Sequence, residues 1–229
     1  MHKMFRQVEA QRNTAGDDTR GRLLDAAIEV FLAEGFRAAR VQDIAERAGM
    51  RLSAINYHFG SKEGLYLAVL QHHADESLQR MYLNEARADT SPPRVRLETI
   101  IRQILVIHLS KNAVTRIAQL VLRELSSPTP ALEVVLKKFT LPMASYLHDL
   151  LREILGPSVP QTWVNRAVFS LLAQCVMYSQ AEALIAAVDP AIAEDPNLVE
   201  NTAHYISDFT WAGLQGIRKQ WEDQVRQGG

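Results

Sequence analysis

The chain has 229 residues, of which 47% are hydrophobic and 22% are charged, a composition typical of a folded globular protein and unlike that of a disordered or collagenous chain. Its 25 Lys and Arg residues nearly balance its 26 Asp and Glu residues, so the net charge of −1 gives no overall sign of nucleic-acid binding. The single cysteine, Cys175, excludes an intramolecular disulfide and a cysteine-based zinc site.

The sequence contains no recognisable export or membrane signal. Basic residues at the N-terminus are not followed by an apolar stretch, which argues against a secretory signal. The most apolar later segments, 167–177 and 181–188, are interrupted by polar residues and fall well short of the about 18 apolar residues of a membrane span. We therefore expect a cytoplasmic protein with no membrane partner.

The N-terminal third is predicted to consist of short helices. Residues 1–17 are polar without a sustained apolar period, which predicts a flexible N-terminal arm. From Thr19, apolar residues recur at intervals of three and four until Gly35, which predicts an amphipathic helix. Short helices are then expected over 41–48 and over about 52–59.

Glycines and one serine mark the boundaries that follow. Gly49 separates the two short helices, because glycine takes the positive φ of a tight turn most readily. Gly60 ends the second of them, and Ser61 caps a fourth helix that begins near Lys62.

The rest of the chain shows helical periodicity, interrupted at 91–93, 126–130, 156–160 and 189–197. Pro142 is expected to kink a helix over 131–155, because proline lacks the backbone N–H. The sequence therefore predicts an all-α fold: an N-terminal three-helix helix-turn-helix domain over 18–64, and a C-terminal helical bundle over 65–229 for ligand binding and dimerisation.

The two short helices that meet at Gly49 carry the pattern that points to function. Between Arg37 and Lys62, five cations stand against two anions, a local excess of +3. Apolar side chains on one face of each helix can pack against the first helix, which leaves the other face of 52–59 outward. That face holds short, mostly polar side chains of the kind that contact base edges when a helix enters a major groove.

The order and spacing of these residues resemble the TetR family of transcriptional regulators. The resemblance rests on Asp43-Ile44-Ala45, on Ala48-Gly49 and on the run 57–65, Tyr-His-Phe-Gly-Ser-Lys-Glu-Gly-Leu. It implies that 52–59 is a recognition helix that binds double-stranded operator DNA. By the same resemblance, Tyr57, His58 and Lys62 contact phosphates.

Several positions differ from the usual family pattern. The expected N-cap Ser or Thr before Val41 is Arg40, whose guanidinium can reach a phosphate instead. The small residue after the turn is Arg51, the usual glycine two positions later is Ser53, and the first of the paired aromatics is Asn56. These changes bear on the operator sequence, since asparagine can bond bidentately to adenine.

From these residues we predict the DNA contacts. The predicted base-contacting residues are Leu52, Ser53 and Asn56. The predicted phosphate-contacting residues are Arg40, Arg51, Tyr57, His58 and Lys62.

A second resemblance concerns the later part of the chain. The segment 123–132, Arg-Glu-Leu-Ser-Ser-Pro-Thr-Pro-Ala-Leu, together with the helix that contains Pro142, resembles the effector domain of the CecR subgroup, and 55–62 fits the same subgroup. This implies an unknown small-molecule effector. A group of aromatic, methionine and polar side chains is predicted to line its pocket: His108, Arg123, Met143, Tyr146, Phe169, Met177 and Tyr178.

The last two long helices, about 161–188 and 198–221, are predicted to form a homodimer. Apolar and small residues repeat at three and four along the second of these helices. The predicted interface residues are Ile206, Thr210, Gly213, Leu214, Ile217 and Trp221.

Catalytic and metal-binding patterns are weak. Gly60-Ser61-Lys62 lacks the Gly-Lys pair of a phosphate-binding loop, and the adjacent His72 and His73 do not have the His-Glu-x-x-His spacing of a zinc site. Cys175 lies in an apolar run typical of a core thiol. We expect a regulator, most simply a ligand-responsive repressor, with no enzyme activity, no cofactor and no metal. The alternative is a helical small-molecule carrier or enzyme that does not bind DNA.

Overall fold

The protein is described by a computed structural model that covers residues 2–75, 78–109 and 113–228, and the side chains of residues 18–72, 83–109 and 115–227. Within these residues every regular element is helical, which confirms the predicted all-α fold. The chain forms two compact units. Unit 1 comprises residues 1–76 and 119–136, and unit 2 comprises residues 77–118 and 137–229.

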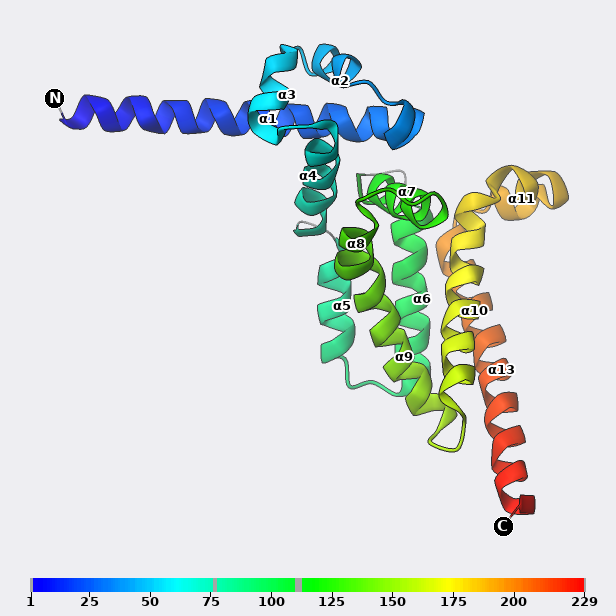
Figure 1. Cartoon of the computed structure of the whole chain (residues 1–229). Helices are drawn as coiled ribbons and strands as arrows, with labels where there is room; N and C mark the ends of the chain where they lie inside the picture. The colour runs from blue at the N-terminus through cyan, green and yellow to red at the C-terminus, as the bar shows by residue number, and fades with distance from the viewer. Residues whose placement is uncertain (1, 76–77, 110–112, 229) are drawn as a thin grey trace. The chain divides into compact units, whose positions relative to one another are not determined.

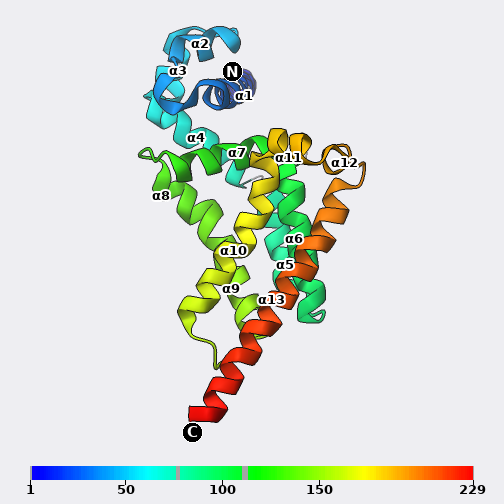
Figure 2. The ribbon, with the colours of Figure 1, turned by 90° about the vertical axis from the view of Figure 1, so that its right-hand side faces the viewer.

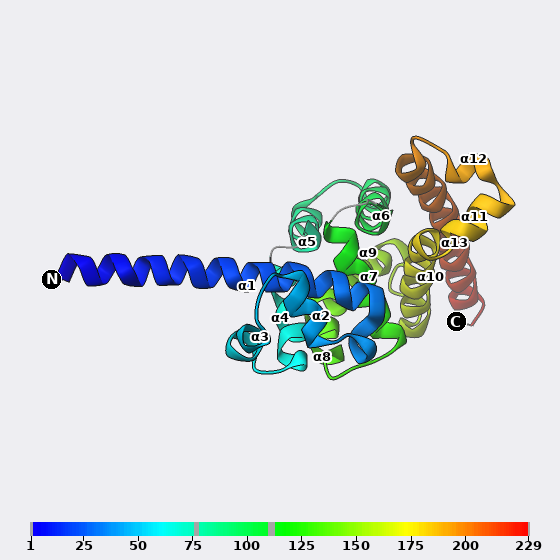
Figure 3. The same cartoon turned by 90° about the horizontal axis from the view of Figure 1, so that it is seen from above.

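Unit 1 contains α1 (His2–Ala38), α2 (Val41–Arg47), α3 (Leu52–Phe59), α4 (Lys62–Asp75), the second half of α7 (Ala113–Ser126) and the short α8 (Leu132–Val135). Figure 3 shows α2, α3 and α4 gathered beside the C-terminal half of α1. Helix α1 is interrupted at Gly35, where φ is 80° and ψ is 163°, so the predicted stop at this glycine is confirmed. The side chains of the predicted arm, residues 1–17, lie outside the described ones, so its flexibility stays a prediction.

The core of unit 1 forms between α1, α2 and α3. Apolar residues that the helical period places on the inner faces are at most 3% exposed: Leu24, Ile28, Phe31, Ile44, Ala45 and Ile55. The turn between α2 and α3 is closed by Gly49, where φ is 66°, and by the Met50 N–H, which donates to the Ala45 carbonyl at 2.8 Å. Arg22 on α1 donates to the Ala48 carbonyl at 2.8 Å. These contacts hold the predicted helix-turn-helix together.

Unit 2 is a bundle in which α6 packs against α13, α10 and α9 (Figure 1). Its helices are α5 (Leu78–Ala88), α6 (Pro93–Leu109), α9 (Leu141–Leu155), α10 (Gln161–Gln180), α11 (Glu182–Val188), α12 (Pro190–Ala193) and α13 (Leu198–Gly228). Of the predicted breaks, 91–93 leads into α6 and 156–160 separates α9 from α10, whereas 126–130 lies between α7 and α8 and 189–197 contains the short α12. The bundle buries a continuous apolar core, in which these residues are fully buried: Ile100, Leu105, Leu147, Leu151 and Leu171.

The hydrogen bonding of the helix changes near Pro142, the position of the predicted kink. The segment expected as one kinked helix is divided into α8, a π-helical turn η1 (Leu136–Thr140) and α9, with Pro142 in the first turn of α9. Proline is tolerated there because the first-turn N–H groups of a helix have no intrahelical acceptor. The helix type therefore changes just before the proline, and a kink at Pro142 stays a prediction.

A ladder of polar side-chain pairs, two of them ion pairs of arginine with a carboxylate, lines the contact of α6 with α13. Residues spaced by four on each helix face one another in antiparallel order: Arg94 with Asp208, Glu98 with His204, and Arg102 with Glu200. Each side chain in the ladder is partly exposed, so each pair contributes little stability alone. The ladder shows which face of α13 is turned toward α6, and Tyr205 lies outside this contact.

Helices α10 and α11 meet at a sharp bend of 80° at Ala181 (Figure 2). No helix in the described residues is by itself long and apolar enough to cross a membrane. Only the bent pair α10 and α11, taken together, meets that criterion of length and composition.

Candidate DNA-binding surface

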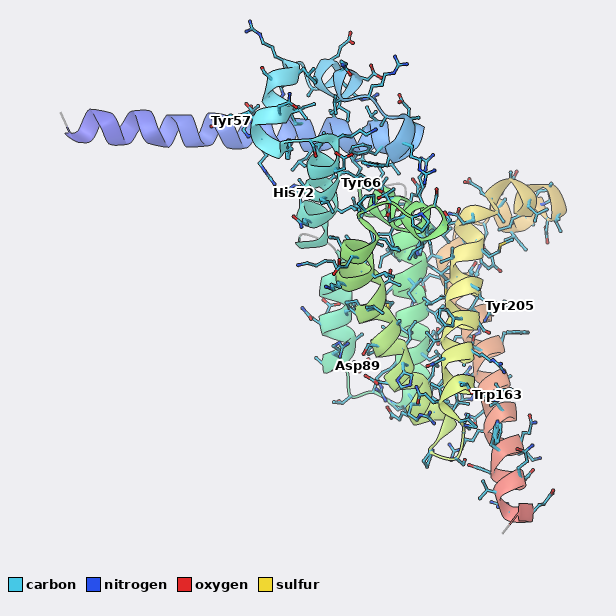
Figure 4. All side chains as sticks on the ribbon, in the orientation of Figure 1. Tyr57, Tyr66, His72, Asp89, Trp163 and Tyr205 are labelled. Atoms are coloured by element: carbon cyan, nitrogen blue, oxygen red, sulfur yellow. The ribbon has the colours of Figure 1, made fainter. Side chains whose placement is uncertain are left out.

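Helix α3 has one buried and one exposed face, as the sequence predicts. Ile55 is 0% exposed and anchors the helix in the core of unit 1, whereas the Tyr57 side chain is 85% exposed. Leu52 is 37% exposed, and Ser53 and Asn56 are also exposed. The predicted base-contacting residues therefore share one open face, and Tyr57, labelled in Figure 4, lies beside them.

Two cations stand at the starts of α2 and α3. Arg40 and Arg51 occupy the N-cap positions of α2 and α3, both in extended backbone conformation and both exposed. The His58 ring lies 5.0 Å from the Tyr57 ring in an edge-to-face arrangement. Guanidinium, imidazole and phenol groups around a polar helix face form a surface suited to a phosphate backbone.

Lys62 has contacts within unit 1 that the sequence did not reveal. Its ammonium donates to the carbonyls of Arg37 at 3.2 Å and Ala39 at 3.1 Å, and lies 4.9 Å from the centre of the Phe36 ring. Lys62 therefore anchors the start of α4 to the end of α1 and the residue that follows it. Its predicted phosphate contact would use the donor capacity that remains, and stays a prediction.

The junction between α3 and α4 is unusually close. A Cβ atom on Gly64 would lie 2.0 Å from the Phe59 carbonyl oxygen, a contact that real Cβ atoms do not make. Ser61 accepts a hydrogen bond from the Gly64 N–H at 3.1 Å. Hydrogen bonding to its own backbone N–H and to Ser61 lowers the pKa of Glu63. The run Gly-Ser-Lys-Glu-Gly thus sets the angle between α3 and α4.

The residues predicted to line an effector pocket do not all lie together. Met143 and Tyr146 are buried in the core of unit 2, with Tyr178 partly buried beside that core. His108 is half-buried, and burial lowers its pKa to about 4. These four residues remain candidates.

Three residues of the predicted pocket need correction. Phe169 is 71% exposed and Met177 is 52% exposed on the outer face of α10, so they do not line the interior of the bundle. Arg123 belongs to unit 1, where its guanidinium donates to the carbonyls of Phe31 and Leu32. These residues were predicted from their type, as large or polar-tipped side chains. Residue type alone does not indicate whether a side chain lies on the buried or the exposed face of its helix.

The predicted dimer interface is corrected in the same way. Ile206 is 1% exposed, Leu214 is 2% exposed and Thr210 is 8% exposed within a single chain, and Ile217 and Trp221 pack against the same core. Only Gly213 of the predicted set is exposed. The repeat at three and four identified the face of α13 that is buried by the chain's own bundle.

Several buried polar atoms of unit 2 were not singled out from the sequence. Among the described residues, these side-chain atoms are buried and have no hydrogen-bond partner: Gln103 Oε1, Thr140 Oγ1, Tyr146 Oη, Ser207 Oγ and Trp221 Nε1. Unpaired buried polar atoms are costly and require an explanation, such as water or a ligand.

In the part of the chain that the structure describes, no three or more His, Cys, Asp or Glu residues are grouped so as to hold a metal ion.

Comparison with known families agrees with this geometry. Residues 23–69 match the family described as bacterial regulatory proteins of the tetR family, and residues 93–214 match the C-terminal domain of the HTH-type transcriptional dual regulator CecR. Curated relatives include CecR of Shigella flexneri, 27% identical over 176 residues, which are 71% of this chain and 76% of that protein. FasR of Mycolicibacterium smegmatis, an HTH-type transcriptional activator, is 42% identical over 85 residues, which are 37% of this chain and 38% of FasR.

A solved structure extends the similarity to the fold of most of the chain. FadR of Bacillus subtilis, a transcriptional regulator solved in complex with stearoyl-CoA, superimposes with a TM-score of 0.62 at 15% sequence identity, covering 84% of this chain and 97% of that one. The chain belongs to the TetR family of bacterial transcriptional regulators, with a DNA-binding helix-turn-helix at its N-terminus and a C-terminal domain of the CecR type.

Proposed function

We propose that the protein is a ligand-responsive repressor that binds its operator through the exposed face of α3. Leu52, Ser53 and Asn56 contact base edges in the major groove. The observation that carries the proposal is the division of α3 into a buried face at Ile55, 0% exposed, and an open face with Tyr57 85% exposed. The open face carries side chains that can form hydrogen bonds with base edges, which supports a role in DNA recognition.

The phosphate contacts surround this face. Arg40, Arg51, Tyr57 and His58 extend from the starts of α2 and α3 and from the end of α3, where a DNA backbone would pass. Lys62 contributes at the start of α4. Such contacts position the protein on DNA, whereas the base contacts select the sequence.

The proposed active form is a homodimer, because one helix-turn-helix contacts too few base pairs for high specificity. Exposed apolar side chains lie on two neighbouring helices: Phe169 and Met177 on α10, with Tyr205 and Phe209 on α13. The Tyr205 and Phe209 rings stack at 6.4 Å, and Tyr205 projects from the outside of the bundle in Figure 4. An apolar surface of this kind on two long helices is suited to a second copy of the chain.

The proposed effector site lies in the interior of unit 2. Its core is apolar, and the unpaired polar atoms of Gln103, Thr140 and Tyr146 would supply hydrogen bonds to a ligand with an apolar tail and a polar group. Acyl-CoA thioesters have this character, and stearoyl-CoA is the ligand of the FadR structure. Effector binding would favour a dimer geometry in which the two α3 helices no longer match successive major grooves.

The protein would act in the cytoplasm, where operator DNA and acyl thioesters are available. It would need no catalytic activity, cofactor or metal. The helical enzyme or carrier that the sequence left open would bind a ligand but no operator.

The test begins with selection of an operator from random DNA by the full-length protein. We expect enrichment of a two-fold symmetric sequence, tighter by about 10³-fold or more than scrambled DNA at physiological salt. Stearoyl-CoA is then added to the complex as a probe, and release of the operator is expected. The absence of any enriched sequence would contradict DNA-binding regulation, whereas an operator that no acyl-CoA releases would contradict only the effector class.

A further inference from the structure

A cluster of contacts within unit 1 joins the end of α7 to α1 and α4, and the proposed DNA contacts do not include it. Arg123 Nη1 donates to the carbonyl oxygens of Leu32 at 2.8 Å and Phe31 at 3.2 Å. These carbonyls belong to the last turn of α1 before Gly35, where a helix has no further N–H groups to offer. Arg123 thus caps the end of this part of α1 from another helix, with its positive charge at the negative end of the helix dipole.

Gly35 makes this cap possible. A Cβ atom at Gly35 would lie 3.0 Å from Arg123 Cζ and Nη2 and 3.2 Å from Nε, so the guanidinium lies directly against the glycine backbone. The φ of 80° at Gly35 is also one that other residues rarely adopt. Gly35 therefore both interrupts α1 and leaves room for the Arg123 guanidinium.

Glu124, the next residue, connects α7 to α4. Its side chain is 1% exposed, and its carboxylate accepts three hydrogen bonds: from Tyr66 Oη at 3.2 Å, from the Thr129 N–H at 2.6 Å and from Thr129 Oγ1 at 2.8 Å. A buried carboxylate is tolerated when its oxygens are satisfied in this way. Glu124 therefore links the turn after α7 to the middle of α4.

Tyr66 completes the connection back to α1. Its ring contacts Phe31 at 4.8 Å and Phe36 at 5.1 Å, and it is 3% exposed. Burial and the neighbouring Glu124 carboxylate raise the pKa of Tyr66, so the phenol remains a neutral hydrogen-bond donor. Phe31 is thus held both through its carbonyl by Arg123 and through its ring by Tyr66.

We infer that Arg123 and Glu124 are positioning residues for operator binding: without touching DNA, they hold α1 and α4 in the arrangement in which α3 reads the operator. The position of α3 depends on both α1 and α4. Ile55 of α3 is buried in the core of unit 1, and the Phe59 carbonyl lies against Gly64 of α4. The inference rests on the proposed function. It adds to the DNA-reading machinery a pair of residues from α7, a helix that also contributes residues 113–118 to unit 2.

The test uses a double-mutant cycle on the full-length protein. Tyr66→Phe removes one hydroxyl and keeps the ring contacts, and Glu124→Gln replaces one acceptor by a donor. We expect each single variant to weaken binding to the selected operator by about two- to thirtyfold, with affinity for scrambled DNA unchanged. Because both changes act on the same Tyr66–Glu124 contact, their effects should not add, and the double variant should bind no more weakly than the weaker-binding single variant.

Matched variants separate positioning from general stability. Glu153→Gln changes a carboxylate of unit 2 that accepts from Arg96 Nη2 at 2.6 Å on the surface, and it should leave operator affinity unchanged. Arg123→Lys should retain more operator affinity than Arg123→Met, because an ammonium can still cap one of the two carbonyls.

Three results would overturn the inference. Unchanged operator affinity in Tyr66→Phe and Glu124→Gln would mean that the contacts do not position α3. Equal losses on operator and scrambled DNA, with loss of cooperative melting, would mean that they only support folding. A wild-type protein without operator preference would contradict the proposed function and this inference with it. If the wild type does select an operator and the variants bind it with unchanged affinity, only the inference is contradicted.

Discussion

Tyr57 and Lys62 were predicted to have the same role, yet their surroundings differ. Tyr57 is 85% exposed, so its phenol is available to a ligand outside the chain. The Lys62 ammonium already donates to the carbonyls of Arg37 and Ala39. We therefore expect Tyr57 to contribute mainly to DNA binding, and Lys62 to contribute to both DNA binding and folding.

This difference can be measured with two variants. Tyr57→Ala should change the free energy of unfolding by less than about 0.5 kcal/mol, because it removes an exposed side chain. Lys62→Met should lower it by about 1 kcal/mol through the lost hydrogen bonds. Both should weaken binding to operator and scrambled DNA alike, with a smaller salt dependence in the Lys62 variant. Urea unfolding and a salt series of DNA affinities are the measurements, and equal stability of the two variants would argue against the anchoring role of Lys62.

His108 predicts a pH dependence of stability. Burial lowers its pKa to about 4 in the folded chain, below the usual value of 6.5. The unfolded chain therefore takes up the proton first as the pH falls, so the stabilisation is present above about pH 6.5 and is lost progressively toward pH 4, by up to about 3 kcal/mol. His108→Gln should flatten this part of the stability curve. A slope unchanged in the variant would assign the pH dependence to other groups.

At the scale of helices, two glycines predict effects of opposite sign. Gly64→Ala should destabilise the fold by about 2 kcal/mol or more, since the added Cβ would lie 2.0 Å from the Phe59 carbonyl and the backbone must shift. Gly21→Ala should stabilise it by about 0.5–1 kcal/mol, because Gly21 lies inside α1 and an added Cβ would meet no described atom within 4 Å apart from its own helix backbone and chain neighbours. Thermal unfolding of both variants is the measurement, and a Gly64→Ala variant as stable as the wild type would refute the close α3–α4 contact.

The helices themselves could largely be predicted from the sequence. Breaks at 91–93, 126–130 and 156–160 were located correctly, because Pro, Gly and Ser act on the local backbone, whereas 189–197 contains the short helix α12. The break at Ala181 and the π-helical turn before Pro142 were not predicted, since neither depends on a turn residue at that position. The exposed and buried faces of α3 followed from its period, with Ile55 inside and Tyr57 outside.

The contacts between helices could not be predicted. The stripe that contains Ile206 and Leu214 has the period of a buried face, but a period does not tell whether the chain itself or a partner buries that face. The contacts of Arg123 and Glu124 with α1 and α4 depend on residues far away in the sequence. Sequence reasoning therefore placed Arg123 in an effector pocket.

For the whole molecule, the proposed interface predicts two different outcomes on one helix. Phe209→Glu, at a side chain 62% exposed, should leave the protomer folded and dissociate the dimer, because a charge would be buried at the apolar contact. Leu214→Asp, at a side chain 2% exposed, should unfold unit 2 instead. Sedimentation at micromolar concentration and circular dichroism distinguish the two. A Phe209→Glu variant that remains dimeric would place the interface elsewhere.

The central claim, that the open face of α3 reads operator bases, is tested most directly by Asn56→Ala. Its affinity is measured for the selected operator, for the full set of single-base-pair variants of that operator and for scrambled DNA. We predict a loss of about 1–3 kcal/mol on the operator, relaxed discrimination at one base pair of each half-site and unchanged affinity for scrambled DNA. Equal losses on operator and scrambled DNA, or unchanged discrimination at every base pair, would contradict base reading by this face.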